Sequence, residues 1–385
     1  MSSLVNRLKS ISKAQLLIIL GVLWLLIQAV YLKTFGIVTT GESTKYIDEC
    51  QQLLQYGYFS DNKYLFYSVY ILIHIFFKKL GFEIIGVYLF QLLLNLLAAY
   101  FFFELNYRIT RKKSIAFIAS SLLLLTQTFE MWTVYLYSES VYSSLIILFA
   151  YCFFVLNQKR KYNLILTTLV FVLIIFSRPT GLLMIPILMS YSFLLFIKQA
   201  KYLKAILFIS IISIAFFFLL DYAMHSSTTF DFMKPFIENE VLCYIPTENT
   251  PALTTHTGSN SILNVFEYIL HNKKQFIYIS YQKFISFWGM QRSYYSNAHN
   301  LYFSLFFYQI YLFGLIGSYE LLKIEKKVFL FILILFTFYT MGVILTCDDW
   351  NNRFNIPIIP FVMMLGAIGI HFCYQKMGKV LSKED

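Results

Sequence analysis

The sequence predicts an all-α, polytopic membrane protein with about ten transmembrane helices and additional juxtamembrane helices on the outer face. Hydrophobic residues fill 58% of its 385 positions, and the mean hydropathy is +0.65, whereas soluble domains are about 45–50% apolar. Long apolar runs recur from one end of the chain to the other. Nothing shows the alternating pattern of a transmembrane β-barrel, and an open sheet would leave backbone amides unpaired in lipid. The spans are therefore expected to be helices.

Ten apolar stretches are long enough, or nearly so, to cross about 30 Å of hydrocarbon. We expect spans at residues 14–37, 82–106, 114–133, 137–156, 162–177, 181–197, 203–221, 300–322, 328–346 and 354–374. The first is too long for a signal-peptide core and lacks a small-residue cleavage site, so it is expected to be retained. A further apolar stretch, Tyr64–Phe77, is short and contains His74. We expect it to be a juxtamembrane or re-entrant helix on the outer side rather than a span.

The basic residues orient these spans. The net charge is +11, and more than half of the 31 Lys and Arg lie in six short segments between or beside the spans. Placing these segments and both termini in the cytoplasm satisfies the positive-inside rule. Residues 38–81 and 222–299 then become two large outer loops of a single membrane domain, 1–385. No nucleic-acid-binding motif accompanies the charge, and we expect no nucleic-acid partner.

The first outer loop opens with carboxylates. Its stretch VTTGESTKYIDECQQLLQYGYFS, Val38–Ser60, contains Glu42, Asp48 and Glu49, although the chain has only 20 acidic residues. We expect an amphipathic helix from Ser43, parallel to the membrane surface. Glu42 would lie at its N-terminal end, where backbone N–H groups and the helix dipole hold a carboxylate. One interpretation makes Glu42 a helix cap, and Asp48 and Glu49 a solvated face; the other makes Glu42 a functional acid.

The second outer loop has two parts. Residues 246–260 are rich in Pro, Thr, Ser and Asn, as loops are. Residues 261–289 place aromatic residues on one side and lysines on the other, which predicts a helix lying on the outer leaflet.

Three more charged positions lie at outer span ends. Glu139 begins one span, Arg178 breaks an apolar stretch in SRPTGLLMIP, and Arg353 opens another span in CDDWNNRFNIPIIPF, preceded by Asp348 and Asp349. Each has a structural alternative, as a boundary residue or an Asp–Arg pair that contacts headgroups. An isolated arginine on this side favours an anion: a carboxylate, a lipid headgroup or a ligand phosphate. Acids and arginines around one outer cavity suit a reaction on an anionic lipid-linked substrate.

These motifs, in this order, resemble the GT-C superfamily of integral-membrane glycosyltransferases, which includes protein O-mannosyltransferases and the lipid A aminoarabinose transferase. In that family an outer loop opens with G-D-S-x-x-Y, which Gly41–Tyr46 resembles with Glu in place of Asp. An acid at a span start follows at Glu139. An R-P-x-G turn follows at 178–181, and R-[FY]-x-x-P-x-x-P matches 353–360.

The resemblance implies inverting transfer of a sugar from a polyprenyl-phosphate donor to a glycan, lipid or protein acceptor. Glu42 corresponds to the family's catalytic acid. The donor phosphate would be held by Arg178 and Arg353, with Lys45 and Lys63 as helpers. Further substrate contacts are expected from Glu139, Tyr46, Asp349, His256 and His299. The chain shows no dedicated metal cage, and we expect neither a metal nor another cofactor. The partners would be the lipid-linked donor, the acceptor and membrane lipids. The resemblance also implies a bacterial inner (plasma) membrane, with the active site facing the periplasm or exterior.

Other functions stay open. A transporter or flippase of lipid-linked glycans would place charges or broken helices near mid-membrane and often show a repeat. A glycan polymerase or ligase would also depend on arginines, but would carry its large outer loop late. A structural assembly subunit would tolerate loss of Glu42 and Arg178. Among the five cysteines, Cys152 and Cys373 lie in apolar runs. Cys50, Cys243 and Cys347 lie in polar loops, and whether two of them form a disulfide stays open.

Overall fold

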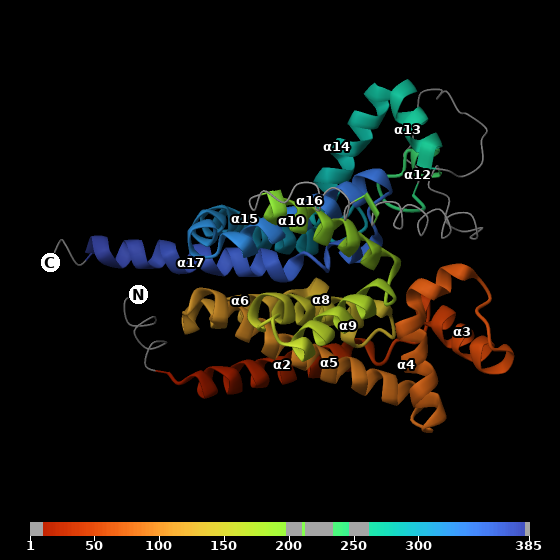
Figure 1. The fold of residues 1–385 in the computed structure, drawn as a ribbon, viewed down its shortest axis with the longest axis horizontal. Coiled ribbons are helices and arrows are strands. Elements are labelled where there is room, and N and C mark those ends of the chain that lie inside the picture. Colours follow the sequence, from red (N-terminus) through yellow and green to blue (C-terminus); the bar gives the residue numbers. More distant parts are fainter. Residues whose placement is uncertain (1–10, 198–209, 212–233, 246–261, 382–385) are drawn as a thin grey trace.

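The computed structural model describes residues 11–197, 210–211, 234–245 and 262–381. The described chain is built from helices, and its β contacts are isolated bridges outside any strand. Most long helices run side by side in one bundle (Figure 1). The helices at one end of this bundle are α3 (Glu42–Tyr56), α4 (Ser68–Lys79), α12 (Lys234–Ile237), α13 (Ile262–His271) and α14 (Lys273–Gly289). The all-α prediction is confirmed.

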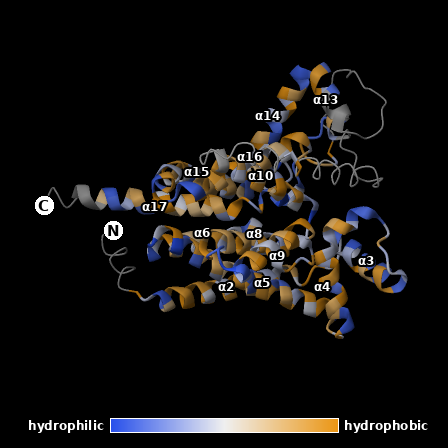
Figure 2. Cartoon of the chain, in the orientation of Figure 1, coloured by the Kyte–Doolittle hydropathy of each residue, from blue (hydrophilic) through white to orange (hydrophobic). Residues whose placement is uncertain are grey.

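Several helices have the length and composition of membrane spans. Among the described residues, five helices qualify by these criteria: α2 (Lys13–Phe35), α5 (Glu83–Thr110), α8 (Ser138–Val155), α15 (Asn297–Ile324) and α16 (Lys326–Leu345). Apolar residues cover most of the bundle helices, whereas hydrophilic stretches gather at the helix ends and in α3 (Figure 2). A membrane protein is therefore the class that the structure supports. These five coincide with five of the ten expected spans.

The remaining expected spans are shorter, broken or shifted. Residues 114–133 form α6 (Lys113–Leu124), followed after a bend of 71° by α7 (Gln127–Glu130) and the 3₁₀ turn η2 (Met131–Thr133). At the break, the Thr126 hydroxyl donates back to the Leu122 carbonyl at 2.7 Å, which competes with continued helix formation. The next two expected spans are α9 (Lys161–Ile175) and, after η3 (Pro179–Leu183), α10 (Met184–Ile197). The expected span 203–221 lies outside the described residues except for 210–211.

The last expected span begins later than predicted. The helix α17 (Ile359–Leu381) starts five residues after position 354, because the 3₁₀ segment η4 (Trp350–Asn355) precedes it. Within η4, Asn351 and Asn352 adopt left-handed backbone angles, with φ of 55° and 57°. Asparagine tolerates left-handed backbone angles better than most residues do. A residue with these angles cannot continue a right-handed helix. The irregular segment carries Arg353 at the end of the bundle.

The helices α15 and α17 pack very closely. Gly317 lies against the Leu365 carbonyl, and Gly369 lies against the Phe313 carbonyl, so a Cβ atom at either glycine would collide with the facing backbone. Small residues of this kind let apolar helices approach within a membrane, where packing replaces the hydrophobic drive.

The first outer loop forms helices that are too short to span. After α3 (Glu42–Tyr56) come η1 (Asn62–Tyr67) and α4 (Ser68–Lys79). With 12 residues, α4 fits the expected juxtamembrane or re-entrant helix and not a full span. The helix α3 begins at Glu42 and ends at Gly57, whose φ of 80° is the left-handed C-cap that glycine favours.

One part of the solvated-face interpretation is wrong. Asp48 is exposed, but Glu49 is buried, with 5% of its surface accessible. The Glu49 carboxylate accepts hydrogen bonds from the Ser60 backbone N–H, at 3.1 Å, and from the Ser60 hydroxyl. Through these hydrogen bonds Glu49 holds the loop that follows α3 against the helix.

Candidate active site

Five charged side chains from distant parts of the chain meet at the end of the bundle that carries α3. We call them the Arg353 cluster: Glu42, Glu139, Arg178, Asp349 and Arg353. They come from the first turn of α3, the first turn of α8, the residue before η3, and η4 with its N-cap. All five were singled out from the sequence, and the structure brings them together.

The start of α3 is placed by contacts with the 134–137 segment. Val38 donates its backbone N–H to the Val134 carbonyl and accepts from the Leu136 N–H, at 2.9 and 3.1 Å. Gly41 has a φ of 67°, and a Cβ atom there would lie 2.5 Å from the Tyr137 hydroxyl. That hydroxyl accepts the Glu42 backbone N–H at 3.2 Å. Glycine at position 41 therefore lets Glu42 face the cluster.

Glu139 is the buried centre of the cluster. Its side chain is fully buried, and its Oε1 lies 2.6 Å from Arg178 Nη1. The same oxygen accepts from Arg353 Nε. One carboxylate thus orients both guanidinium groups, an arrangement that strengthens charge-assisted bonds in a dry environment.

Two further carboxylates complete the charge distribution. Asp349 Oδ2 lies 3.5 Å from Arg353 Nε and 3.7 Å from Arg178 Nη2. Glu42 Oε2 lies 2.5 Å from Arg353 Nη2. The cluster therefore pairs three acids with two arginines.

Aromatic rings enclose both guanidinium groups. The Arg353 guanidinium lies 5.5–5.7 Å from the ring centres of Trp132, Tyr137 and Trp350. The Arg178 guanidinium lies 5.7 Å from the centre of Phe354. Cation–π contacts of this kind hold arginine in place while it remains planar and able to donate.

Glu42 differs from the other two acids in accessibility. Its side chain is 26% exposed, against 11% for Asp349 and none for Glu139. Burial alone would raise the pKa of Glu42, but Arg353, Arg178 and Lys45 outweigh it and lower that pKa to about 2. For Asp349 burial prevails over Arg353 and Arg178, and the pKa is raised. Glu42 is therefore the ionised acid that a solvent-borne substrate can reach.

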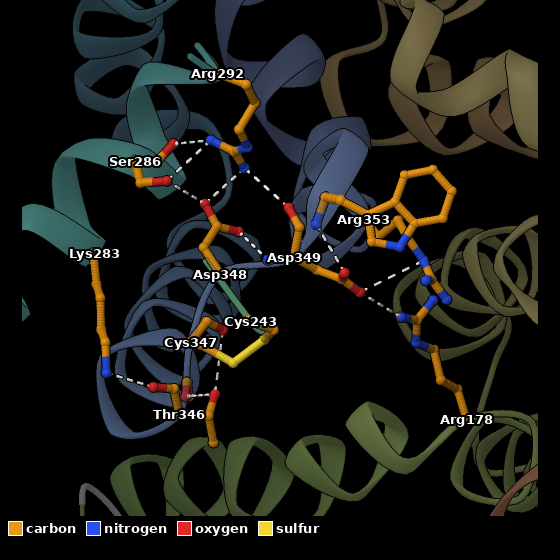
Figure 3. Close-up of a disulfide and its surroundings, with 12 residues drawn as sticks. Arg178, Cys243, Lys283, Ser286, Arg292, Thr346, Cys347, Asp348, Asp349 and Arg353 are labelled. Carbon is orange, nitrogen blue, oxygen red and sulfur yellow. Dashed lines mark hydrogen bonds and ion pairs between the residues drawn. A yellow bond between two sulfur atoms is a disulfide. The ribbon is translucent and has the colours of Figure 1, made fainter. Parts of the chain in front are cut away.

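A second hydrogen-bond network, around Asp348, adjoins the Arg353 cluster. Arg292 Nη2 donates to Asp348 Oδ2 at 2.7 Å and to the Asp349 carbonyl at 3.2 Å. Ser286, on α14 (Lys273–Gly289), donates to the same Asp348 oxygen at 2.8 Å. Figure 3 shows this network beside the Arg178 and Arg353 side chains. Arg292 was missed from the sequence, although it is a lone arginine in the aromatic stretch GMQRSYYSN.

A disulfide joins the second outer loop to the same segment. Cys243 and Cys347 are bonded, with Cα atoms 5.1 Å apart, and Cys50 remains free and buried. The Cys243 N–H donates to the Asp348 carbonyl, and the Asp348 N–H donates to the Val241 carbonyl, both at 2.8 Å. The disulfide left open by the sequence thus lies next to Asp348 and Asp349 (Figure 3).

Lys283 fills the space on the other side of this disulfide segment. It is fully buried on α14, donates to the Thr346 carbonyl and lies 4.8 Å from the ring centre of Phe236. Burial lowers the pKa of Lys283 to about 8, and Glu240 only partly opposes this. The surface helix expected from residues 261–289 is therefore tied to the site by a buried lysine.

Only some of the other predicted site residues in the described part of the chain lie beside the Arg353 cluster. Lys45 lies 3.7 Å from Glu42, and the buried Tyr46 hydroxyl is 3.3 Å from Ser138 Oγ, next to Glu139. Lys63 pairs with Asp61 at 3.4 Å. His299 lies on α15 and lines a separate cavity with Phe35 and Tyr135. His256 lies outside the described residues.

Within the described ranges, no group of three His, Cys, Asp or Glu side chains is arranged to hold a metal ion. No protein-family model, curated protein or solved structure matches this chain.

Proposed function

We propose that the chain is an inverting glycosyltransferase of the GT-C type, which moves a sugar from a polyprenyl-phosphate donor to a glycan, lipid or protein acceptor. The observation that carries this proposal is the convergence of Glu42, Arg178 and Arg353 in one partly open cluster. A reachable carboxylate beside two oriented guanidinium groups matches the needs of a phosphate leaving group and a hydroxyl nucleophile.

Glu42 acts as the general base in this proposal. Of the three acids it is the most accessible, and its ionised state is held by the neighbouring cations. Glu139 is buried beneath both arginines and serves to orient them. Asp349 acts with Glu139 in setting the position of the Arg353 guanidinium.

The arginines exchange partners when the donor binds. In the structure Arg353 donates a hydrogen bond to Glu42. A donor phosphate attracts the same guanidinium, and arginine binds phosphate with its planar fork of donors. Glu42 then loses a cation, so its pKa rises toward the ordinary carboxyl range and it becomes a stronger base. Donor binding thereby prepares the base for the chemical step.

In the reaction, the acceptor hydroxyl oxygen attacks the anomeric carbon from the face opposite the phosphate. The hydroxyl proton passes to the Glu42 carboxylate. The bond between the anomeric carbon and the phosphate oxygen breaks, and its electron pair leaves with polyprenyl phosphate. Arg178 and Arg353 stabilise the negative charge that develops on that phosphate.

The proposed location follows from chain orientation and the disulfide. With about ten spans and cytoplasmic termini, the cluster faces the outside of a bacterial inner membrane. The Cys243–Cys347 disulfide supports this side, because disulfides persist in oxidising compartments and are rare in the cytosol. Lipid-linked sugars would reach the site from the outer leaflet.

A turnover assay tests the function. The full chain, reconstituted in nanodiscs, is incubated with radiolabelled polyprenyl-phosphate sugars and a membrane glycolipid extract. We expect release of polyprenyl phosphate with at least one donor, and loss of at least about a hundredfold in Arg178→Ala. The exposed Lys159 provides a matched control, Lys159→Ala, which should retain full turnover. If the wild-type chain neither binds nor consumes any donor, the proposal is wrong.

A further inference from the structure

A pocket of about 220 Å³ lies between α2, α5 and α6, and we call it the α2 pocket. Its lining residues include Leu17, Gly21, Trp24, Leu96, Tyr100 and Leu124. None of the described residues that line it is Asp, Glu, Lys or Arg. A Cβ atom at Gly21 would meet no atom of another described helix within 4 Å, so the pocket is open at this point. The proposed reaction uses none of these side chains.

Two contacts between α2 and α5 define the ends of the pocket. At one end, Trp24 Nε1 donates to Asn95 Oδ1 at 2.6 Å. At the other end, Lys13 forms an ion pair with the buried Glu104. Lys13 is the first residue of α2, and this start lies at the opposite end of the bundle from α3 (Figure 1). The pocket therefore runs from the middle of α2 toward the end of the bundle that is away from the Arg353 cluster.

The walls of the pocket lead to lysines at this end. On α2, the lining residues Leu17 and Trp24 follow Lys13 by four and eleven positions, which places all three on one face of the helix. On α6, Leu124 follows Lys113 by eleven positions. Lys113 Nζ donates to the Ile11 carbonyl at 2.7 Å, which holds the start of α6 beside the start of α2.

The same end carries more cations than carboxylates. Residues 104–113 contain one carboxylate, Glu104, and four cationic side chains. Lys13 pairs with Glu104, and Arg108 Nε lies 3.6 Å from the same carboxylate. The Arg108 side chain is 51% exposed. Because one carboxylate faces two cations, an anionic group that binds here gains a counter-ion.

The dimensions fit a lipid of one leaflet. From Lys13 to Trp24 the helix rises about 16 Å, and one leaflet has about 15 Å of hydrocarbon. A protein cavity of about 150 Å³ accommodates benzene, so by proportion the α2 pocket takes a chain segment of roughly eight carbons. A phosphate beside Lys13 and Arg108 would thus have its acyl chain within reach of the pocket.

We propose that the α2 pocket binds an anionic phospholipid, with its phosphate at Lys13 and Arg108 and one acyl chain between α2, α5 and α6. Basic pockets between transmembrane helices recognise anionic headgroups in this way. The lipid differs from the proposed sugar donor, whose phosphate would be held by Arg178 and Arg353 at the other end of the bundle. In the orientation proposed above, it belongs to the inner leaflet. Its binding does not require the transfer reaction.

Tryptophan quenching tests the site, because Trp24 lines the pocket. The full chain is reconstituted in phosphatidylcholine vesicles, and brominated phosphatidylglycerol is compared with brominated phosphatidylcholine. Bromine on an acyl chain quenches a nearby indole, and the quenching that is lost in Trp24→Phe is the signal of this site. We expect the Trp24 signal to show an about fivefold preference for phosphatidylglycerol, the effect of one uncompensated cation.

Two variants separate charge from space. Arg108→Gln should abolish the preference, because it leaves the Lys13–Glu104 pair in place and removes the uncompensated cation. Gly21→Leu fills the pocket and should also abolish the preference, while thermal stability is retained because leucine is a better helix former than glycine. The matched control, Lys159→Gln, removes an exposed cation between α8 and α9 and should leave the preference unchanged.

The outcomes are independent of the proposed function. Equal affinity of the two brominated lipids at Trp24 would overturn the inference, and so would a preference that Arg108→Gln or folded Gly21→Leu leaves unchanged. Turnover enters none of these measurements. Lipid preference without glycosyl transfer would keep the lipid site and remove the transferase, whereas transfer without lipid preference would do the opposite.

Discussion

At the scale of single residues, Glu42 and Arg353 form an ion pair that restrains both side chains. The pair keeps Glu42 ionised at pH values well below its ordinary pKa of 4.5. A carboxyl with such a low pKa is a weak base, because basicity falls with pKa. The arrangement therefore suits a resting state that becomes reactive only when another anion takes the arginine.

This exchange predicts two different pH dependences. The value of kcat/KM reports the free enzyme, where the pKa of Glu42 is about 2, whereas kcat reports the donor-bound state. Glu42 must be deprotonated to accept a proton, so activity is lost as the pH falls through its pKa. Between pH 3 and pH 8 we therefore expect an acidic limb in kcat, near the ordinary carboxyl pKa of about 4, and none in kcat/KM, whose limb lies near pH 2. An acidic limb in kcat/KM that coincides with the limb in kcat would contradict the exchange.

The charged residues of the cluster could be identified from the sequence. Their interaction partners could be identified only in part. Glu42, Glu139, Arg178, Asp349 and Arg353 were identified because carboxylates and arginines at span ends are rare and costly. Arg292 was not, because its partner Asp348 is 56 positions away and no local pattern links them.

At the scale of elements, the disulfide and the Arg292–Asp348 pair hold the segment before η4. Cys347 is bonded to Cys243, and Asp348 is bonded to Arg292 and to the backbone near Cys243. Together they fix Asp349, which contacts both cluster arginines. The second outer loop thus supports the charged groups without supplying any of them among its described residues.

We therefore expect the disulfide to matter for both stability and turnover. Replacing Cys243 and Cys347 together by serine should lower the free energy of unfolding by about 2–4 kcal/mol, since the bond closes a long loop. Turnover should fall because Asp349 loses its fixed position. Thermal unfolding and turnover of the double variant are compared with Cys373→Ser, which removes a free thiol. Unchanged turnover in a folded double variant would show that the loop does not position the site.

Helix breaks were harder to predict than helices. The long apolar runs at residues 14–37, 82–106 and 300–322 became single helices, because nothing in them competes with the helix. The run at 114–133 was read as one span, but Thr126 marks a bend. The late start of α17 depends on left-handed backbone angles at Asn351 and Asn352. Asparagine permits these angles but does not require them.

At the scale of the whole molecule, the Arg353 cluster and the Arg292–Asp348 pair lie at one end of the bundle. The helices α3, α4, α13 and α14 occupy that end, and the last described residues of α17 lie at the other (Figure 1). Hydropathy and the basic segments predicted this one-sided arrangement, because both are set by the membrane and not by individual contacts.

The proposed orientation can be measured by cysteine labelling in cells. The free cysteines are first replaced by serine, and single cysteines are then introduced at the exposed Tyr58 and Lys159. A membrane-impermeant maleimide should label Tyr58→Cys in intact spheroplasts, and Lys159→Cys only after permeabilisation. The reverse pattern would place the cluster in the cytoplasm and invert the proposed topology.

The central claim, that Glu42 is the base of the transfer, is tested most directly by comparing two variants on the same helix. Glu42→Gln and Asp48→Asn each replace one carboxylate by its isosteric amide, but Asp48 is exposed and outside the cluster. Each variant is loaded with the donor, and donor affinity and single-turnover transfer to the acceptor are measured. We expect Glu42→Gln to bind the donor at least as tightly as the wild type, because Arg353 is released, and to transfer about 10²–10⁴-fold more slowly. Asp48→Asn should match the wild type in both. Transfer at the wild-type rate by folded, donor-bound Glu42→Gln would contradict the account.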